Sequence, residues 1–329
     1  MSTLKDVARE AGVSVTTASY ALKGSKKISH ETTVRVKEAA KRLNYLPSGI
    51  ARGLKASKTW NIGVFLHGYS GPTYGDVLQA IHDGVSSANY EMMVCSTSVS
   101  DRLLMERHMD GAIILNSFIP DKTLERVQSP NFPVVVMDRT IELPNVSCVV
   151  ADNVAGGYMA VRHLLDFGYK KLAFIIGGKE SYENAARVEG IKKALYEAGI
   201  DFGAVPVAIG DFKEETGKSS MKSLLNQYPD IDAVFCVNDE MAIGAMNAIK
   251  ESGRIIPQDI AVIGFDDIPL ASYTTPALTT IRVDRRLWGY LAAVNLLELI
   301  DRKGSGRIVK IPVELIRRET VGKISVGIT

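Results

Sequence analysis

Long apolar segments, an export signal and an even set of cysteines are all missing from this sequence. No run of about eighteen apolar residues is present, so a membrane-spanning helix is not expected. The opening residues Met1 to Asp6 lack the basic-then-apolar pattern of a secretory signal, which predicts a cytoplasmic location. The three cysteines, Cys95, Cys148 and Cys236, lie far apart in runs typical of strands, and we expect them to be reduced and structural.

Recognisable catalytic and metal-binding patterns are also scarce. The sequence has no Gly-x-Gly-x-x-Gly after its first expected strand, no phosphate-binding loop around Gly177 and no Gly-x-Ser-x-Gly turn. The five histidines have no metal-ligand spacing. His67 follows the first expected strand and could enter a cleft, but a lone histidine is more often a surface or structural residue. We therefore expect no metal, no cofactor and no enzyme, although turnover of a bound sugar would overturn that expectation.

Positive charge is abundant only at the start of the chain. Residues 1–58 contain twelve Lys and Arg against four Asp and Glu, a surplus of eight, whereas the whole chain has a formal charge of +2. The remaining residues therefore carry a net charge of −6. A basic head on a mildly acidic body predicts that the head meets a polyanion, although a basic run is often only a solvated surface.

The basic head has the spacing of a helix-turn-helix. Thr3 can cap a helix with Asp6 in its first turn, and Gly12 ends that helix. Ser14 then caps a second helix after a very short turn, and Ser29 caps a third. The residues expected to pack inward are Leu4, Val7, Ala8, Ala11, Ala18, Ala21, Leu22, Val34, Val36, Ala39, Ala40 and Leu43.

Hydroxyl side chains face outward from the expected second helix. Thr16, Thr17, Ser19 and Tyr20 lower helix propensity yet lie away from the predicted core. Polar groups there can bond phosphates and base edges in a DNA major groove, which admits one helix. A plain surface helix of a three-helix bundle is the alternative.

Two segments of the sequence identify a family resemblance. Residues 4–14 (LKDVAREAGVS) and 44–54 (NYLPSGIARGL) resemble the LacI/GalR family of bacterial transcription regulators, with likeness to its catabolite-control and purine-repressor branches. The resemblance covers nearly the whole chain and implies that Val15, Thr16 and Tyr20 read bases while Thr17 and Ser19 contact phosphates. The predicted DNA-binding residues are Ser14, Val15, Thr16, Thr17, Ser19, Tyr20, Ser48, Ile50, Ala51, Leu54 and Lys55.

A short hinge helix is expected within residues 47–59. Ser48 can cap a segment in which Ile50, Ala51 and Leu54 share a face, but its two glycines each cost about 1 kcal/mol relative to alanine. So short a helix is marginal alone, and we hypothesise that it folds when two copies pair on DNA. By the resemblance, Leu54 would wedge into the minor groove and kink the duplex. An ordinary linker is the alternative.

Short apolar runs alternate with helical patterns from Asn61 onward, which predicts parallel sheets in βαβ units. The runs are residues 62–66, 92–95, 112–115, 134–137, 172–176, 233–237 and 261–265. Because these are too many strands for one core, we expect an α/β fold with a three-helix helix-turn-helix head and two lobes of parallel, doubly wound sheets. The family resemblance implies that these two lobes form a periplasmic-binding-protein-like domain. The predicted divisions are the head 1–46, the hinge and linker 47–59, one lobe of 60–150 with 282–311, and a second lobe of 151–281 with 312–329.

Polar residues follow several of these runs, where open α/β sheets bind ligands. They are Asp138, Asn238 with Asp239, and Asp266 with Asp267. These residues either form a polar cleft or only cap the helices that follow, since Asp and Asn are common caps.

The resemblance favours a ligand cleft. Arg187, within residues 185–190, matches the family's effector-binding arginine, and Asp266 matches its effector-binding aspartate. The full set of predicted effector-binding residues is Tyr74, Asp138, Arg187, Phe212, Asn238 and Asp266. Carboxylate, amide and guanidinium groups with an aromatic ring suit a polyhydroxylated ligand such as a sugar or oligosaccharide.

These observations predict a sequence-specific regulator of transcription, a repressor that binds a pseudo-palindromic operator as a homodimer and answers to a small ligand between its lobes. A purine is less favoured, because residues 181–184 lack the polar side chains of that branch. A phosphocarrier protein as corepressor stays open, since residues 239–282 look like the catabolite-control branch. A transporter's solute-binding protein would need a signal peptide and no head.

Overall fold

A computed structural model describes residues 2–46, 58–69, 71–96, 102–302 and 304–322 of the chain. The chain divides into two compact units, Met1–Trp60 and Asn61–Thr329. Within the described ranges, none of the helices combines the length and apolar character that crossing a membrane requires.

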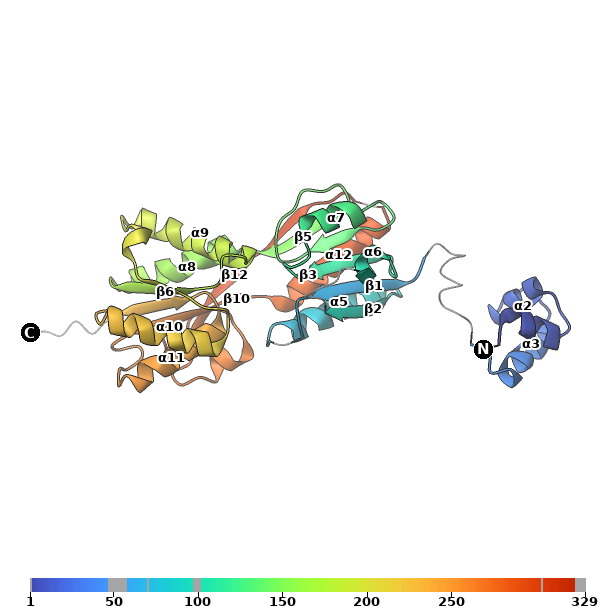
Figure 1. The fold of residues 1–329 in the computed structure, drawn as a ribbon, viewed down its shortest axis with the longest axis horizontal. Helices are drawn as coiled ribbons and strands as arrows, with labels where there is room; N and C mark the ends of the chain where they lie inside the picture. Colours follow the sequence, from blue (N-terminus) through green and yellow to red (C-terminus); the bar gives the residue numbers. More distant parts are fainter. Residues whose placement is uncertain (1, 47–57, 70, 97–101, 303, 323–329) are drawn as a thin grey trace, which may run out of the picture. The chain divides into compact units, whose positions relative to one another are not determined.

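The described part of the first unit contains three helices (Figure 1), and their beginnings agree with the predicted caps. They are α1 (Leu4–Glu10), α2 (Val15–Leu22) and α3 (His30–Arg42). Thr3 and Asp6 form a capping box at α1, while the hydroxyls of Ser14 and Ser29 accept backbone N–H groups at the starts of α2 and α3. Gly12 has a φ of +63°, a left-handed conformation that glycine adopts without strain and that makes the tight turn into α2 possible.

Small apolar side chains make up the core of the first unit. The buried members are Val7, Ala8, Ala11, Ala18, Ala21, Val36, Ala39 and Ala40, with Leu4, Leu22 and Leu43 partly buried against them. The predicted inward position of Val34 is wrong, because this side chain is 39% exposed. Val34 lies two residues from Val36, which is about 200° around the helix, so the two cannot share the inward face.

The second unit contains two six-stranded sheets. The first sheet has the order β11-β5-β4-β3-β1-β2, and all of its strands are parallel. Helices α5 and α12 pack together on one of its faces, and α6 and α7 lie on the other. The bounds are β1 (Asn61–Leu66), α5 (Tyr74–Ser87), β2 (Glu91–Ser96), α6 (Arg102–Met105), β3 (Gly111–Leu115), α7 (Asp121–Val127), β4 (Val134–Val136), β5 (Val146–Ala151), α12 (Arg285–Ile300) and β11 (Ile308–Ile311).

The second sheet has the order β12-β10-β9-β8-β6-β7, and only β12 runs antiparallel to its neighbour. Helices α8 and α9 cover one face and α10 and α11 the other (Figure 1). The bounds are α8 (Asn153–Asp166), β6 (Leu172–Ile176), α9 (Tyr182–Glu197), η1 (Phe202–Ala204), β7 (Val207–Ile209), α10 (Glu214–Gln227), β8 (Ala233–Cys236), α11 (Asp239–Glu251), β9 (Ala261–Asp266), η2 (Pro269–Ser272), β10 (Thr279–Val283) and β12 (Val313–Ile316).

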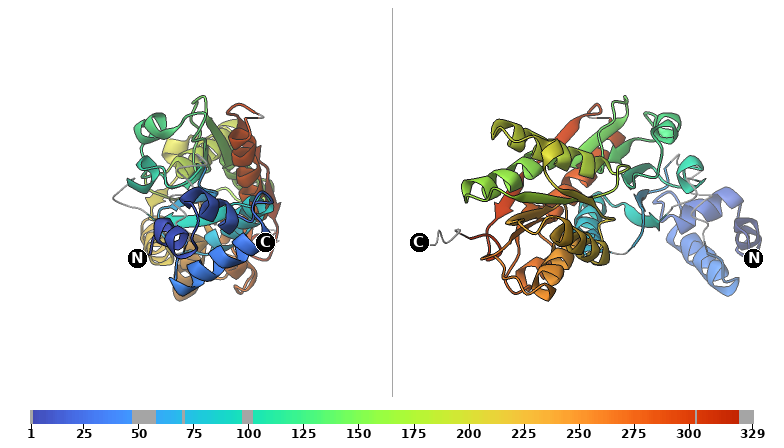
Figure 2. Two further views of the ribbon diagram at one scale, coloured as in Figure 1. Left: turned by 90° about the vertical axis from the view of Figure 1, so that its right-hand side faces the viewer. Right: turned by 60° about the vertical axis from the view of Figure 1, so that its left-hand side comes forward.

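The chain passes between the two sheets at three places. It leaves the first sheet after β5, returns to it between β10 and α12, and leaves again between β11 and β12. The orange-red α12 and the red β11, late in the sequence, therefore belong with the cyan and green segments of the first sheet, whereas the red β12 belongs to the second sheet (Figure 2). We call each sheet with its helices a lobe, the first lobe being the one that contains β1.

Both faces of the central strands are buried, which is why these strands are continuous apolar runs instead of alternating ones. In β1, Val64 belongs to the cluster beneath α5 and α12, whereas Phe65 belongs to the cluster on the opposite face. The expectation for the cysteines is confirmed: Cys95 lies in β2, Cys148 in β5 and Cys236 in β8, and all three are free.

Candidate functional sites

The exposed face of α2 is the first candidate site. Val15 and Tyr20 are 41% and 46% exposed, which is unusual for side chains of their size, and Thr16 is exposed beside them. Thr17 and Ser19, which were also predicted to contact DNA, are half-buried. The α2 residues predicted to read DNA therefore lie in one short helix, with the bulkiest side chains facing outward.

A small set of hydrogen bonds fixes the first turn of α2. The Ser14 hydroxyl accepts the backbone N–H of Thr17 at 3.0 Å, and the two hydroxyl oxygens lie 2.8 Å apart. This cap ties down one end of the helix whose outward face carries Val15 and Thr16. The hinge residues predicted to bind DNA lie outside the described residues: Ser48, Ile50, Ala51, Leu54 and Lys55.

A cavity of about 970 Å³ opens between the two lobes of the second unit. Its walls follow the carboxyl ends of β1, β3, β4 and β5 in the first lobe and of β6, β7, β8, β9 and β10 in the second. This is where open parallel sheets leave a crevice for ligands. All of the residues predicted to bind an effector line this one cavity: Tyr74, Asp138, Arg187, Phe212, Asn238 and Asp266.

Arg187 is held by three hydrogen bonds in the wall of the cavity. Its Nε donates to Oδ1 of Asn153 at 2.9 Å, its Nη1 to the carbonyl of Val237 at 2.5 Å, and its Nη2 to Oδ1 of Asp266 at 3.2 Å. The guanidinium also lies 3.8 Å from the ring centre of Phe265. Arg187 is therefore a rigid group that orients Asp266, with its charge already shared with a carboxylate.

Asp138 forms the corresponding pair in the first lobe. Both of its carboxylate oxygens accept hydrogen bonds from Nη1 of Arg139, at 3.0 and 3.2 Å. Arg139 also donates to Asp121 and to the carbonyl of Ile119, so its position is fixed. Burial raises the pKa of Asp138, and the neighbouring Arg139 opposes that rise.

Asn238 is both a cavity residue and a helix cap. Its Oδ1 accepts the backbone N–H of Met241 at the start of α11, and its Nδ2 donates to the carbonyl of Phe212 at 2.8 Å. Phe212 has a φ of +70°, and a Cβ added to Gly177 would lie 2.2 Å from its ring. The absence of a side chain at Gly177 thus leaves room for the ring of Phe212. The alternative that Asn238 caps the following helix is correct for its side-chain oxygen.

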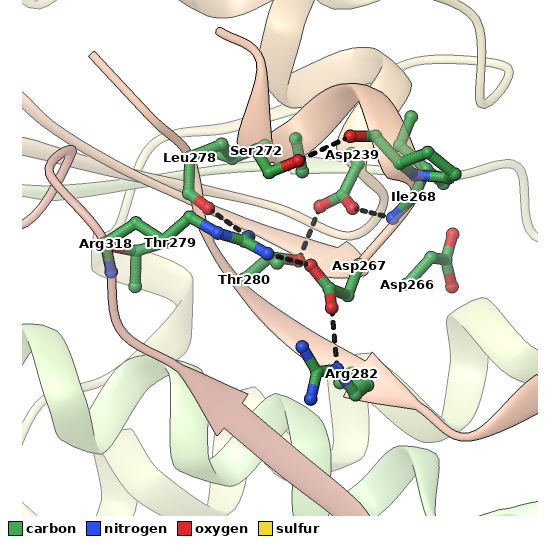
Figure 3. Close-up of polar contacts among 12 residues, drawn as sticks. Asp239, Asp266, Asp267, Ile268, Ser272, Leu278, Thr279, Thr280, Arg282 and Arg318 are labelled. Carbon is green, nitrogen blue, oxygen red and sulfur yellow. Dashed lines mark hydrogen bonds and ion pairs between the residues drawn. The ribbon is translucent and has the colours of Figure 1, made fainter. Parts of the chain in front are cut away.

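Two of the carboxylates predicted at strand ends do not line this cavity (Figure 3). Asp239 is fully buried, where its oxygens accept from the Thr280 hydroxyl at 2.5 Å and from the backbone N–H of Ile268 at 2.8 Å. Asp267 accepts from Arg282 at 2.7 Å and from Arg318 at 2.6 Å. Asp239 follows Asn238 in the chain, and Asp267 follows Asp266. In each pair the first residue lines the cavity, and the second points away from it into hydrogen bonds with the rest of the lobe.

Several lining residues were not among the predicted ones. Glu183, one turn before Arg187 on α9, contributes a carboxyl whose pKa is raised to about 7 by burial, with a smaller effect of Asp138. Trp288 and Arg285 come from α12 of the first lobe. Glu183 and Arg187 are four residues apart and so lie on one helix face, a spacing from which Glu183 could have been predicted to line the cavity. No sequence pattern indicates that α12 contributes to this cavity.

Tyr74 begins α5 at the opposite side of the cavity. Its hydroxyl has a raised pKa because it is buried and because the carboxyls of Glu183 and Asp138 lie near it. Glu183 belongs to the second lobe and Asp138 to the first, so Tyr74 lies where groups of both lobes meet.

Comparisons with known proteins match both units. Residues 3–48 match the bacterial regulatory proteins of the lacI family, and residues 161–321 match a periplasmic binding protein-like domain. The HTH-type transcriptional repressor PurR of Serratia proteamaculans (strain 568) is 34% identical over 331 residues, which cover 98% of this chain and 97% of that protein.

Solved structures agree with this relationship. The lac repressor dimer bound to operator and the anti-inducer ONPF has a TM-score of 0.82 at 28% identity, covering 97% of this chain and 98% of that one. The transcriptional regulator CelR in complex with cellobiose has a TM-score of 0.73 at 27% identity, covering 98% of this chain and all of that one.

A helix-turn-helix unit joined to a periplasmic-binding-protein-like unit defines a class, the DNA-binding regulators of transcription that are built on a ligand-binding fold. Within that class, this chain belongs to the lacI family of bacterial regulatory proteins.

Proposed function

We propose that this regulator is a repressor that binds a pseudo-palindromic operator as a homodimer and that a small ligand in the cavity, a sugar or oligosaccharide, lowers its operator affinity. The observation that carries the proposal is the cavity between the lobes, with six predicted residues on its walls. Relatives with bound cellobiose and bound ribose support a carbohydrate as ligand.

The chemistry of the walls favours a polyhydroxylated molecule. Carboxylate oxygens of Asp266 and Asp138 can accept hydrogen bonds from hydroxyls, and the ring of Phe212 can contact the C–H face of a sugar. Because both carboxylates are already positioned by arginines, they need little reorganisation when the ligand binds. A volume of about 970 Å³ accommodates a mono- or disaccharide with water.

Arg285 supplies a route from the cavity to the first lobe. It extends from α12 and donates to the backbone carbonyls of Asp266 at 2.6 Å and Asp267 at 2.9 Å, in the second lobe. A ligand that moves Asp266 therefore acts on α12, and through it on α5, which packs against α12. We infer that this link biases the equilibrium between two lobe arrangements, and ligand binding shifts their populations.

The DNA-binding part of the proposal assigns base contacts to Val15, Thr16 and Tyr20 and phosphate contacts to Thr17 and Ser19. Exposed Lys23, Lys26 and Lys27 flank this helix and add sequence-independent attraction to phosphates. The proposal also assigns DNA contacts to Ser14 and to the hinge residues Ser48, Ile50, Ala51, Leu54 and Lys55. The proposed divisions are 1–46, 47–59, 60–150 with 282–311, and 151–281 with 312–329.

Fluorescence anisotropy with the full-length chain tests the proposal. An operator is first selected from random duplex DNA, and cellobiose and ribose are then titrated into the complex. We expect one of these sugars to weaken operator binding and Arg187→Lys to reduce that response, because lysine cannot reproduce the three hydrogen bonds of Arg187.

Arg162→Lys is the matched control, since Arg162 forms its ion pair with the exposed Asp166 on α8 and does not line the cavity. Tighter operator binding with sugar would reverse the sign of the proposal. No response to sugar, together with a response to an added phosphocarrier protein, would replace the sugar by the protein corepressor.

A further inference from the structure

The charges that line the cavity are unbalanced. Eight of the described lining residues are Asp or Glu, whereas three are Lys or Arg. This excess matters only for groups that stay charged and unpaired inside the cavity, because exposed charges at its rim are screened by water. Glu180 and Asp211 belong to the exposed rim.

The inner cations are already committed to groups of the protein. Arg187 donates to Asp266, and Arg139 behind the wall donates to Asp138, so each of these carboxylates has its own arginine. Arg285 donates both of its Nη atoms to backbone carbonyls. Arg187 and Arg139 therefore share their charge with carboxylates of the cavity, whereas the Nε of Arg285 is buried without a hydrogen-bond partner among the described residues.

Glu183 and Glu240, both half-buried, differ from Asp138 and Asp266, because among the residues that the structure describes no hydrogen bond or ion pair reaches their carboxyl groups. Of the two, Glu183 is the one that lies near Arg187 and Tyr74. Its charged neighbours are Arg187, which favours the ionised form, and Asp138 and Asp266, which oppose it. Glu183 thus places an unpaired carboxyl group near those of Asp138 and Asp266, each of which already has its own arginine.

Aromatic side chains line the same cavity. Tyr74 lies close enough to Glu183 for its own pKa to be raised by it, and Tyr182, Phe118 and Trp288 also line the cavity. Aromatic faces attract cations as well as sugar C–H groups. Carboxylates beside aromatic rings form the combination of groups that recognises a protonated amine.

We propose that the ligand carries a protonated amine that pairs with Glu183, which makes it an amino sugar or a similar cationic polyol and excludes phosphorylated sugars. The inference rests on the proposed function, because it names the chemistry of the ligand in the same cavity. Asp138 and Asp266 accept the hydroxyls of this ligand, and Glu183 reads its charge.

Trp288 makes a direct binding assay possible. The chain has two tryptophans, so Trp60→Phe leaves the cavity residue Trp288 as the single indole. The probes are glucosamine with glucose and galactosamine with galactose, matched pairs that differ in one amine, together with glucosamine 6-phosphate. All are titrated into the full-length Trp60→Phe chain at about pH 7, where an amine of this kind is largely protonated.

The expected result is that at least one amino sugar binds about tenfold or more tightly than its neutral counterpart. Adding Glu183→Gln should remove that preference, so that amino and neutral sugars bind with similar affinity. Glu189→Gln is the matched control, because Glu189 is exposed on the same helix and does not line the cavity. If Glu183→Gln fails to fold, the preference between amine and hydroxyl in the Trp60→Phe chain decides the question.

The inference is overturned if no amino sugar binds more tightly than its neutral counterpart, if the preference survives Glu183→Gln, or if the 6-phosphate binds best. Its failure is distinct from failure of the proposed function. Neutral sugars that bind and release operator DNA would leave the proposed function intact, whereas an amino sugar that binds without any effect on operator affinity would contradict the proposed function alone.

Discussion

The two units of this protein bury their apolar groups in different ways. The core of the helix-turn-helix unit consists of valines and alanines, whereas the largest fully buried side chains of the second unit are phenylalanines such as Phe65, Phe174 and Phe265. Burial contributes about 25 cal/mol per Å² of apolar surface, so the small head gains little stability from its core. We therefore expect the helix-turn-helix unit to be only marginally stable and the second unit to be much more stable. A single substitution should then unfold the first unit and leave the second folded.

The largest expected effect is the loss of the head alone. Val36→Asp places a charge among the alanines of the head core, at a position with no exposed surface, which costs several kcal/mol and exceeds the stability that so small a core provides. We expect specific operator binding to disappear while the fluorescence of Trp288 and its response to ligand remain. Anisotropy and fluorescence on the same sample measure both.

Val34→Asp is the matched control, because it is the same substitution two residues earlier in α3 at a side chain that is 39% exposed. It should fold and lose much less affinity than Val36→Asp. Equal loss in the two variants would mean that the added charge repels DNA and that burial is not the cause.

The next effect concerns the scaffold. Gly190 on α9 packs against α8 so closely that an added Cβ would lie 2.1 Å from the backbone carbonyl of Val154. Backbone cannot yield as a flexible side chain can, so Gly190→Ala should lower the free energy of unfolding of the second unit by about 3 kcal/mol. Urea unfolding followed by Trp288 fluorescence measures the change.

Gly75→Ala on α5 is the control for that substitution, since nothing lies within 4 Å of its added Cβ. Its effect should be neutral or stabilising by about 0.5 kcal/mol, because alanine favours helix. An unchanged unfolding midpoint for Gly190→Ala would show that the two helices can separate at little cost.

A smaller effect should depend on pH. The carboxyl of Glu183 has its pKa raised from 4.5 to about 7 by burial, so the unfolded state ionises first as the pH rises. This group therefore costs the protein no stability at about pH 4, progressively more between pH 4.5 and 7, and a constant amount above that. Glu183→Gln should reduce this slope, to which Asp138, Glu240 and Asp266 also contribute through their raised pKa values. It should stabilise the second unit at about pH 8 by about 1 to 2 kcal/mol, a value reduced for the water in the cavity.

Urea unfolding at a series of pH values measures this slope, with Glu189→Gln as the control of equal charge. If Glu183→Gln shows the same pH dependence as the unmodified chain, the carboxyl is ionised normally in the folded state and the argument for an unpaired buried charge fails.

The smallest effect tests the cap of the reading helix. Ser14→Ala removes the acceptor for the backbone N–H of Thr17 and should destabilise α2 by about 1 kcal/mol, which in a marginal head weakens operator binding severalfold. Ser14→Thr retains a capping hydroxyl and should restore most of the affinity. Without such rescue, Ser14 acts through a contact to DNA that threonine cannot make.

Local patterns in the sequence predicted the head well. The caps at Thr3, Ser14 and Ser29 and the turn at Gly12 depend on neighbours within a few residues, which a sequence displays directly. The error at Val34 has a local cause too, because an apolar residue off the 3.6-residue period was assigned to the core.

Strands of the second unit were predicted where they are wholly apolar. The segment Val146–Ala151 was recognised as typical of a strand only through Cys148 and was left out of the predicted alternating runs, since Ser147 interrupts its apolar pattern. It is nevertheless a buried strand between β4 and β11. A short strand in the middle of a sheet receives its hydrogen bonds from distant segments, so neighbouring sequence carries little of that information.

The amino-acid sequence by itself determined the basic helix-turn-helix, the alternation that makes two parallel sheets, and the polar residues at strand ends, because each depends on spacing along the chain. Only the tertiary structure decided which of those residues meet. It bound Asp239 and Asp267 to groups inside the second lobe, placed Arg285 and Trp288 from the first lobe in the cavity wall, and left Glu183 without a partner among the described residues. Long-range packing sets these outcomes, since the partners of Asp239 and Asp267 lie 41 and 51 residues away in the sequence.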